Sequence, residues 1–129
     1  MYSKIILSFC FVLCTAFQSY AHEMTPAYPK LKTSYIDGVS VTKMKLFNRR
    51  EEVQYYQIEV FTFDFKPVPF ASTDKIIKIG FNRYKTFNVY IKSNDIDKVV
   101  YICTQSKLFK ETNQISLITS RVCSKIKDK

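Results

Sequence analysis

Alternation of apolar and polar residues with a period of two dominates this 129-residue sequence. In residues 39–48, Thr42, Met44 and Leu46 fall on one face of an extended chain and the residues between them fall on the other. Similar runs, rich in β-branched and aromatic residues, recur along the chain and end at short polar turns, whereas no segment combines helical periodicity with helix caps. The pattern predicts an all-β protein built as an antiparallel β-sandwich in a single domain.

Turns and crossovers are expected at the glycines and prolines, which are few. Gly38 and Gly80 are expected in turns, and the prolines of the segment "KPVPF" (residues 66–70) predict an edge or a crossover between sheets. The alternation changes face within residues 53–65, which predicts a bulge or a strand that moves to another sheet. The strands are expected within residues 39–48, 53–65, 74–80, 85–92, 98–105 and 114–127.

The first 21 residues have the three parts of a secretory signal. Lys4 supplies a positive charge, residues 5–17 are apolar, and Ser19 and Ala21 are the small residues that precede a cleavage site. We expect residues 1–21 to be removed and residues 22–129 to form the domain. The apolar run is too short to span a bilayer, so we expect an exported protein without stable membrane insertion.

The cysteine count predicts one disulfide. Two of the four cysteines lie within the signal, and Cys103 and Cys123 remain in a compartment where disulfides persist. The chain has no C-x-x-C motif, and its only histidine is His22. The sequence therefore predicts a Cys103–Cys123 bond, no metal site and no cofactor.

Catalytic chemistry has little support in the residue inventory. With one histidine at the new N-terminus, neither a histidine-based ribonuclease nor a Ser-His-Asp triad can be assembled. The charged residues 49–52 are expected to decorate a hairpin turn, and residues 93–97 are expected to form a solvated loop. We therefore expect a protein that binds rather than an enzyme.

The formal net charge of +9 raises the question of a nucleic-acid partner. Aromatic residues that could stack on bases are Tyr84, Phe87 and Tyr90. An exported protein meets little nucleic acid, however, and alternating lysines such as Lys43 and Lys45 are typical of solvent-facing strand positions that oppose aggregation. We expect no nucleic-acid partner.

The order of these segments resembles the N-terminal immunoglobulin-like domain of the periplasmic chaperones that assemble pili by the chaperone–usher route. The similarity covers about residues 28–127 and rests on the turn "SYIDG" (34–38), Asn48 before a charged hairpin, the Pro-containing crossover, "VVYICTQ" (99–105) and the last strand, which ends in basic residues. The resemblance implies an immunoglobulin-like β-sandwich.

The resemblance also implies a function. Pilus chaperones lend the last strand of this domain to a pilus subunit that lacks its own final strand, a form of β-augmentation. Carried to this sequence, the donor residues are Ile115, Leu117 and Thr119; a shift in register would nominate Ile118, Ser120 and Val122 instead. The partner implied is a pilin-like or other secreted subunit in the periplasm, although secretion from the cell remains an alternative.

A basic cleft of the family holds the subunit's C-terminal carboxylate with one Arg and one Lys. Here the lysine falls on Lys125 or Lys127, whereas the arginine position falls on Thr33 with Lys32 beside it. The family has a second sandwich domain, and a second chain that replaces it is one partner that the resemblance allows. The alternative function is a secreted immunoglobulin-like binding module, such as a pilus-associated subunit, a surface interaction protein or an inhibitor, that donates no strand.

The Cys103–Cys123 pair is not a general feature of that domain, but the expected hairpin gives it a geometric role. A hairpin between the last two strands with its turn near Asn113 would place Cys103 opposite Cys123. The bond would then pin the register of the closing strand, in which a slip of one residue would exchange its two faces.

Overall fold

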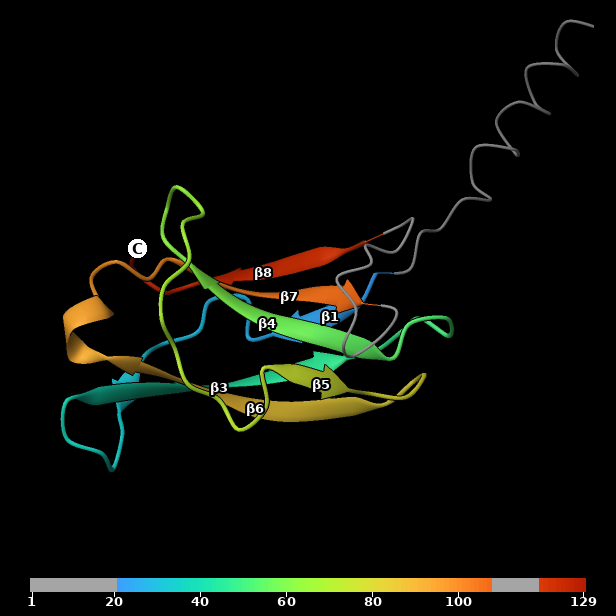
Figure 1. The fold of residues 1–129 in the computed structure, drawn as a ribbon, viewed down its shortest axis with the longest axis horizontal. Helices are drawn as coiled ribbons and strands as arrows, with labels where there is room; N and C mark the ends of the chain where they lie inside the picture. The colour runs from blue at the N-terminus through green and yellow to red at the C-terminus, as the bar shows by residue number, and fades with distance from the viewer. Residues whose placement is uncertain (1–20, 108–118) are drawn as a thin grey trace, which may run out of the picture.

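The structure is a computed structural model that describes residues 21–107 and 119–129, and these residues form two antiparallel sheets packed face to face (Figure 1). Sheet A contains β1 (Glu23–Thr25), β2 (Lys32–Thr33), β3 (Val39–Phe47) and β6 (Tyr84–Lys92). Sheet B has the order β5 (Ile76–Lys78), β4 (Tyr55–Phe61), β7 (Tyr101–Lys107) and β8 (Arg121–Lys125). A short 3-10 turn, η1 (Ser93–Asp95), follows β6. The predicted all-β, immunoglobulin-like sandwich is confirmed.

The period-two alternation sorts each strand between the core and the solvent. In β3, Met44 and Leu46 are fully buried, whereas Lys43 and Lys45 between them are exposed. In β4, Ile58 on the opposite sheet is also buried. Apolar side chains of the two sheets thus meet in one core, and burying each one fully contributes roughly 1.5–3 kcal/mol.

The predicted turn and crossover both occur. Gly38 has a φ of 74°, a left-handed conformation that glycine adopts without the steric cost of a Cβ, and it leads the chain into β3. After β4, Pro67 bridges to Phe61 in sheet B and Ala71 bridges to Tyr90 in sheet A. The segment "KPVPF" therefore carries the chain from one sheet to the other, and the change of face within residues 53–65 marks the end of β4.

The disulfide joins β7 to β8, the last two strands. Cys103 lies directly opposite Cys123 in the antiparallel ladder, and the two form a disulfide. Backbone bonds of the alternate pairs, such as Ile126 N–H to the Val100 carbonyl, place the cysteines at a pair without backbone hydrogen bonds to each other. Opposing side chains approach most closely at such pairs, which suits a cross-strand bond. The register expected from the sequence is present.

Three expectations fall outside the described residues: the signal within residues 1–20 and the donor residues Ile115 and Leu117. The residue at the other expected register, Ile118, lies there too. Within residues 21–107 and 119–129, no helix is long and apolar enough to cross a membrane.

Candidate partner-binding edge

β8 forms one margin of sheet B, and part of its outer edge is open (Figure 1). Towards its end the edge is covered, because Lys125 N–H donates to the Ala27 carbonyl at 3.0 Å and Lys127 N–H donates to the Pro29 carbonyl at 2.9 Å. The main chains of Arg121 and Cys123 face the same way, since alternate residues of a strand direct their amides to the same side. Among the described residues, no backbone group pairs with these two. This open edge offers unpaired N–H and C=O groups to another strand.

The side chains around this edge alternate between the core and the solvent. Ser124 is buried and Val122 packs against the core, whereas Thr119, Arg121 and Cys123 are exposed. Thr119 of the first donor set is therefore on the outer face. Of the residues of the shifted register, Val122 faces inward, and Ser120 is held by the hydrogen bonds described below.

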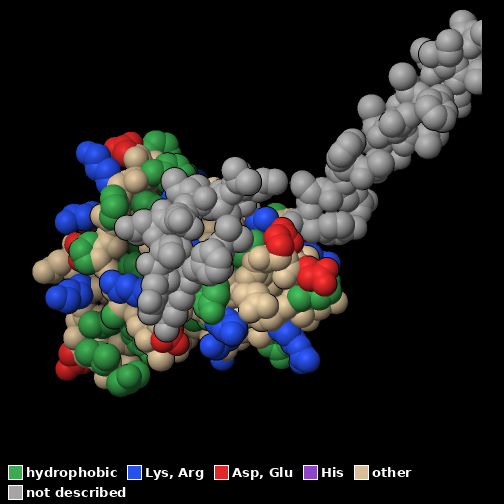
Figure 2. Space-filling model, turned by 45° about the vertical axis from the view of Figure 1, so that its right-hand side comes forward, with side chains coloured by type: hydrophobic (Ala, Val, Ile, Leu, Met, Phe, Trp, Pro, Cys, Tyr) green, Lys and Arg blue, Asp and Glu red, His purple; other side chains and the backbone are tan. Residues whose placement is uncertain are grey.

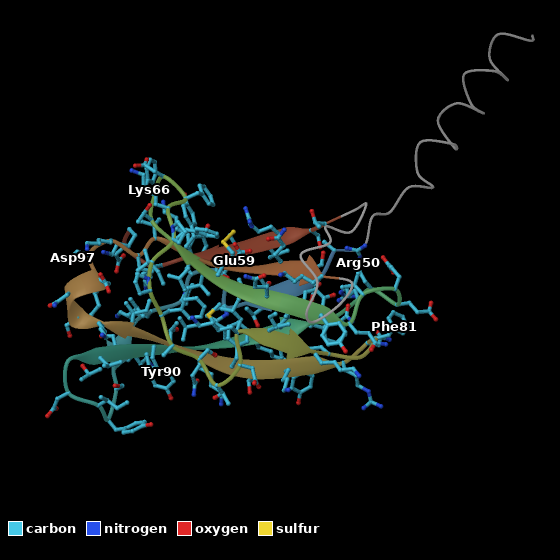
Figure 3. All side chains as sticks on the ribbon, viewed as in Figure 1. Arg50, Glu59, Lys66, Phe81, Tyr90 and Asp97 are labelled. Carbon is cyan, nitrogen blue, oxygen red and sulfur yellow. A yellow bond between two sulfur atoms is a disulfide. The ribbon has the colours of Figure 1, made fainter. Side chains whose placement is uncertain are left out.

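The outer face beside the open edge carries a polar and aromatic frame. Arg121 lies 3.3 Å from the Glu59 carboxylate and donates to the Gln105 side-chain oxygen at 3.1 Å. Its guanidinium also lies 5.2 Å from the ring centre of Phe61. Figure 3 shows Glu59 on β4 beside the yellow disulfide bond. These contacts hold the start of β8 against sheet B without covering its backbone edge.

His22 lies buried where the chain enters β1, and it bonds to both β7 and the residue before β8. Its Nε2 lies 3.1 Å from the Thr104 carbonyl oxygen and its Nδ1 lies 3.1 Å from the Ser120 hydroxyl. A carbonyl oxygen only accepts, so the ring proton sits on Nε2, and Nδ1 accepts from Ser120. The neutral ring thereby links three segments that are distant in sequence.

Arg50 and Asn48 extend this cluster beneath the β3–β4 loop. The Asn48 amide donates to the carbonyls of Val53 at 2.7 Å and Ile79 at 2.9 Å, and its oxygen accepts from Arg50 N–H and from the Tyr56 hydroxyl. The buried Arg50 guanidinium pairs with Glu52 at 2.7 Å and donates to the Ser120 hydroxyl at 3.4 Å. Figure 3 shows Arg50 at the end of the sandwich, close to the end of β7. Arg50 thus helps to hold Ser120.

This cluster was not predicted from the sequence. Residues 49–52 were expected to decorate a hairpin turn, but the Arg50 side chain is buried, and its donors find acceptors on β7 and before β8. His22 was expected only as the new N-terminus, yet it is 2% exposed. Neither residue belongs to a motif, and the one available signal was Asn48 placed immediately before a charged hairpin.

Burial is the main reason that the pKa of His22 falls from 6.5 to about 4, and the nearby Arg50 cation lowers it further against the opposing effect of the Thr104 bond. The unfolded chain binds a proton near pH 6.5, so the stability from the neutral ring is complete above that pH and is lost as the pH falls towards 4. We expect this loss to reach about 2 kcal/mol between about pH 7.5 and pH 5. Urea unfolding across this range should show it.

A His22→Gln variant is the matched control, since glutamine retains one donor and one acceptor but has no proton to gain. Its stability should change less than that of the wild type over the same pH range. Parallel pH profiles for the two proteins would contradict the assignment.

A basic hollow of about 790 Å³ lies on the outer face of sheet A, beside the segment that follows β8. Lysines line it from three parts of the chain: Lys30, Lys32, Lys43 and Lys127. None of the four forms an ion pair within the described part of the chain. Tyr28 and Tyr90 supply apolar and hydroxyl surface to the hollow.

Of the three lysines predicted from the sequence to anchor a carboxylate, two line the hollow. Lys32 and Lys127 both line it, although they are far apart in the chain, whereas Lys125 does not. Since Cys123 precedes Lys127 by four residues, the open edge and the hollow are at most about 14 Å apart along this segment. A carboxylate placed in the hollow would be attracted by several lysine ammonium groups.

No protein-family model and no curated protein sequence matches this chain. Among solved structures, the E. coli chaperone DraB is similar to it, with a TM-score of 0.60 at 14% identity, over 84% of this chain and 54% of DraB. The periplasmic chaperone SfaE gives a TM-score of 0.49 at 11% identity, over 82% of this chain and 53% of its own. A FixG-related protein from Vibrio parahaemolyticus gives 0.47 at 16% identity, over 84% of this chain and 96% of its own.

The chain spans about half the length of DraB. At this level of identity the likeness concerns the fold, and it agrees with the resemblance found in the order of the sequence segments. Residues 21–107 and 119–129 have the immunoglobulin-like fold of a pilus assembly chaperone domain.

Proposed function

We propose that this protein is a non-catalytic periplasmic chaperone that binds a pilin-like secreted subunit by donating its closing strand. The observation that carries the proposal is the open edge at Arg121 and Cys123, the two residues of β8 whose main chains face away from β7 and lack a described backbone partner. A subunit that lacks a strand would gain backbone bonds along this edge, as in other β-augmentation complexes. The chaperone fold shared with DraB supports the same function.

Donation requires apolar side chains to enter the partner, and Ile115, Leu117 and Thr119 are proposed to supply them. Thr119 already lies exposed next to β8. On this proposal the disulfide and the His22 cluster hold the base of the donor segment in one register. The hollow with Lys32 and Lys127 then receives the partner's terminal carboxylate.

The direct test replaces Ile115 or Leu117 with Asp and measures co-purification of a subunit that lacks its final strand. We expect each variant to lose most capture, because a buried carboxylate without a partner costs several kcal/mol. Thermal unfolding of the free variant should match the wild type, which excludes misfolding. If both variants still capture the subunit fully, the protein binds without donating these residues, as the alternative binding-module function requires.

The anchor is tested separately with Lys32→Ala and Lys127→Ala. Each should weaken binding of the subunit by about tenfold, because a charge-assisted hydrogen bond to the carboxylate contributes roughly 1.5–3 kcal/mol. Lys125→Ala is the matched control, since this lysine has the same charge and lies two residues away but outside the hollow. Equal effects of all three substitutions, or persistence of the effect on a subunit with an amidated C-terminus, would count against the anchor.

A further inference from the structure

β6 has a second open edge, in the other sheet. On one side it pairs with β3 along its whole length, from Tyr84 opposite Phe47 to Lys92 opposite Val39. On its other side, within the described part of the chain, only Tyr90 is paired, exchanging backbone bonds with Ala71 at 2.9 and 2.8 Å. The main chain of every second residue faces that same side, which adds Lys92 after Tyr90 and three positions before it. Those three are Tyr84, Thr86 and Asn88, and no described backbone group pairs with them.

This edge has few of the features that usually prevent strand addition. Residues 84–88 contain no proline, and Lys85 is the single charged residue among them. Tyr84, Lys85 and Thr86 are all exposed. A regular, solvent-exposed edge of this kind is a template for a further strand.

The lysines on the outer face beside this edge would favour a partner strand that carries acidic residues. The outward positions of β3 and β6 include Lys43, Lys45 and Lys92 and no acidic residue. The Lys45 ammonium extends from β3 over β6 and lies 4.1 Å from the ring centre of Tyr84. A strand added to β6 would lie about 4.8 Å further out, within reach of this cation. Figure 2 shows Lys and Arg side chains spread over the visible face of the molecule, with Asp and Glu side chains among them.

The inner side of the same edge is apolar at Phe87, although Lys85, two residues earlier, lies on the same side. Phe87 points inward, is half-buried and packs against the hydrophobic core. A neighbouring strand would place alternate side chains beside Phe87, where an apolar residue would extend the core. The residues between them would lie on the outer face near Lys43 and Lys45, where a carboxylate would be favoured.

We propose that β6 is a second docking edge, at which residues 84–88 pair with an extended segment of a partner protein in which acidic and apolar residues alternate. The site lies in sheet A and uses none of the proposed donor residues of the closing strand, although Lys43 also lines the basic hollow. It therefore gives the protein a second partner, or a second contact with a large one, and it stands whether or not β8 donates a strand.

The test uses the full mature chain and a short synthetic peptide in which Glu alternates with Val, with a Lys–Val peptide as the charge control. The Glu–Val peptide should slow amide hydrogen exchange at Tyr84, Thr86 and Asn88, measured by NMR, and should leave exchange at Arg121 unchanged. The Lys–Val peptide should bind at least about tenfold more weakly. Unchanged exchange at Thr86, or equal binding of the two peptides, overturns the proposal.

Two variants separate backbone pairing from side-chain attraction. Thr86→Pro removes an N–H that faces the open edge and makes no bond to β3, so it should abolish peptide binding, whereas Thr86→Val should retain it. Lys45→Glu should reduce binding of the Glu–Val peptide by at least about tenfold. If the proline variant does not fold, this charge reversal still tests the proposal. Protection of the same amides by self-association without peptide would assign the edge to a second copy and overturn an acidic partner.

Discussion

Arg121→Pro should abolish capture of a strand-deficient subunit while leaving the fold of the free protein intact. The Arg121 N–H faces the open edge of β8 rather than β7, so proline removes no bond of the sheet. A partner strand would lose one hydrogen bond and bury an unpaired carbonyl, which together cost about 3 kcal/mol, or roughly a hundredfold in affinity. The measurement is the dissociation constant for the subunit, alongside the free energy of unfolding.

Arg121→Val is the matched control for this experiment. It removes the guanidinium and its contact with Glu59 but keeps the backbone N–H. If capture depends on main-chain pairing, the valine variant binds nearly as well as the wild type and only the proline variant fails. If both variants fail equally, the side chain of Arg121 carries the binding and strand donation along this edge is wrong.

Replacing both Cys103 and Cys123 with alanine should lower the free energy of unfolding by about 3 kcal/mol. The bond closes a loop with a sequence separation of 20, and in the chain-entropy model a cross-link of this length restricts the unfolded state by about that amount. Urea unfolding of the oxidised wild type and the double variant measures the difference. Mass spectrometry without reductant should find both thiols bonded in the wild type.

The disulfide should also matter for binding, because it holds β8 in the register that exposes its edge. In the double variant, amide exchange at Arg121 to Lys125 should accelerate more than exchange in β3, which the bond does not touch. Reduction of the wild type with dithiothreitol provides the control, since it breaks the same bond without altering the sequence. Equal stability of the oxidised, reduced and substituted proteins would contradict a structural role.

The arrangement of the candidate site explains why sequence patterns located it only in part. The lysines near the end of the chain look alike in sequence, since Lys125 and Lys127 lie on the same face of an alternating strand. Only the packing of the segment after β1 against the end of β8 brings Lys127 together with Lys32 in one hollow. No local pattern records that contact.

The sequence by itself determined where β3 to β8 form, although it gave no sign of β1 and β2, and it determined which faces of β3 and β4 are buried, where Gly38 turns the chain and which cysteines can bond. These properties depend on alternation, turn chemistry and residue inventory, all of which act over a few neighbouring residues. The tertiary structure decided which edges stay open and which polar groups become buried. Arg50 is the clearest case, because its acceptors Ser106 and Ser120 lie on distant segments, and only the folded sandwich brings those groups within hydrogen-bonding distance.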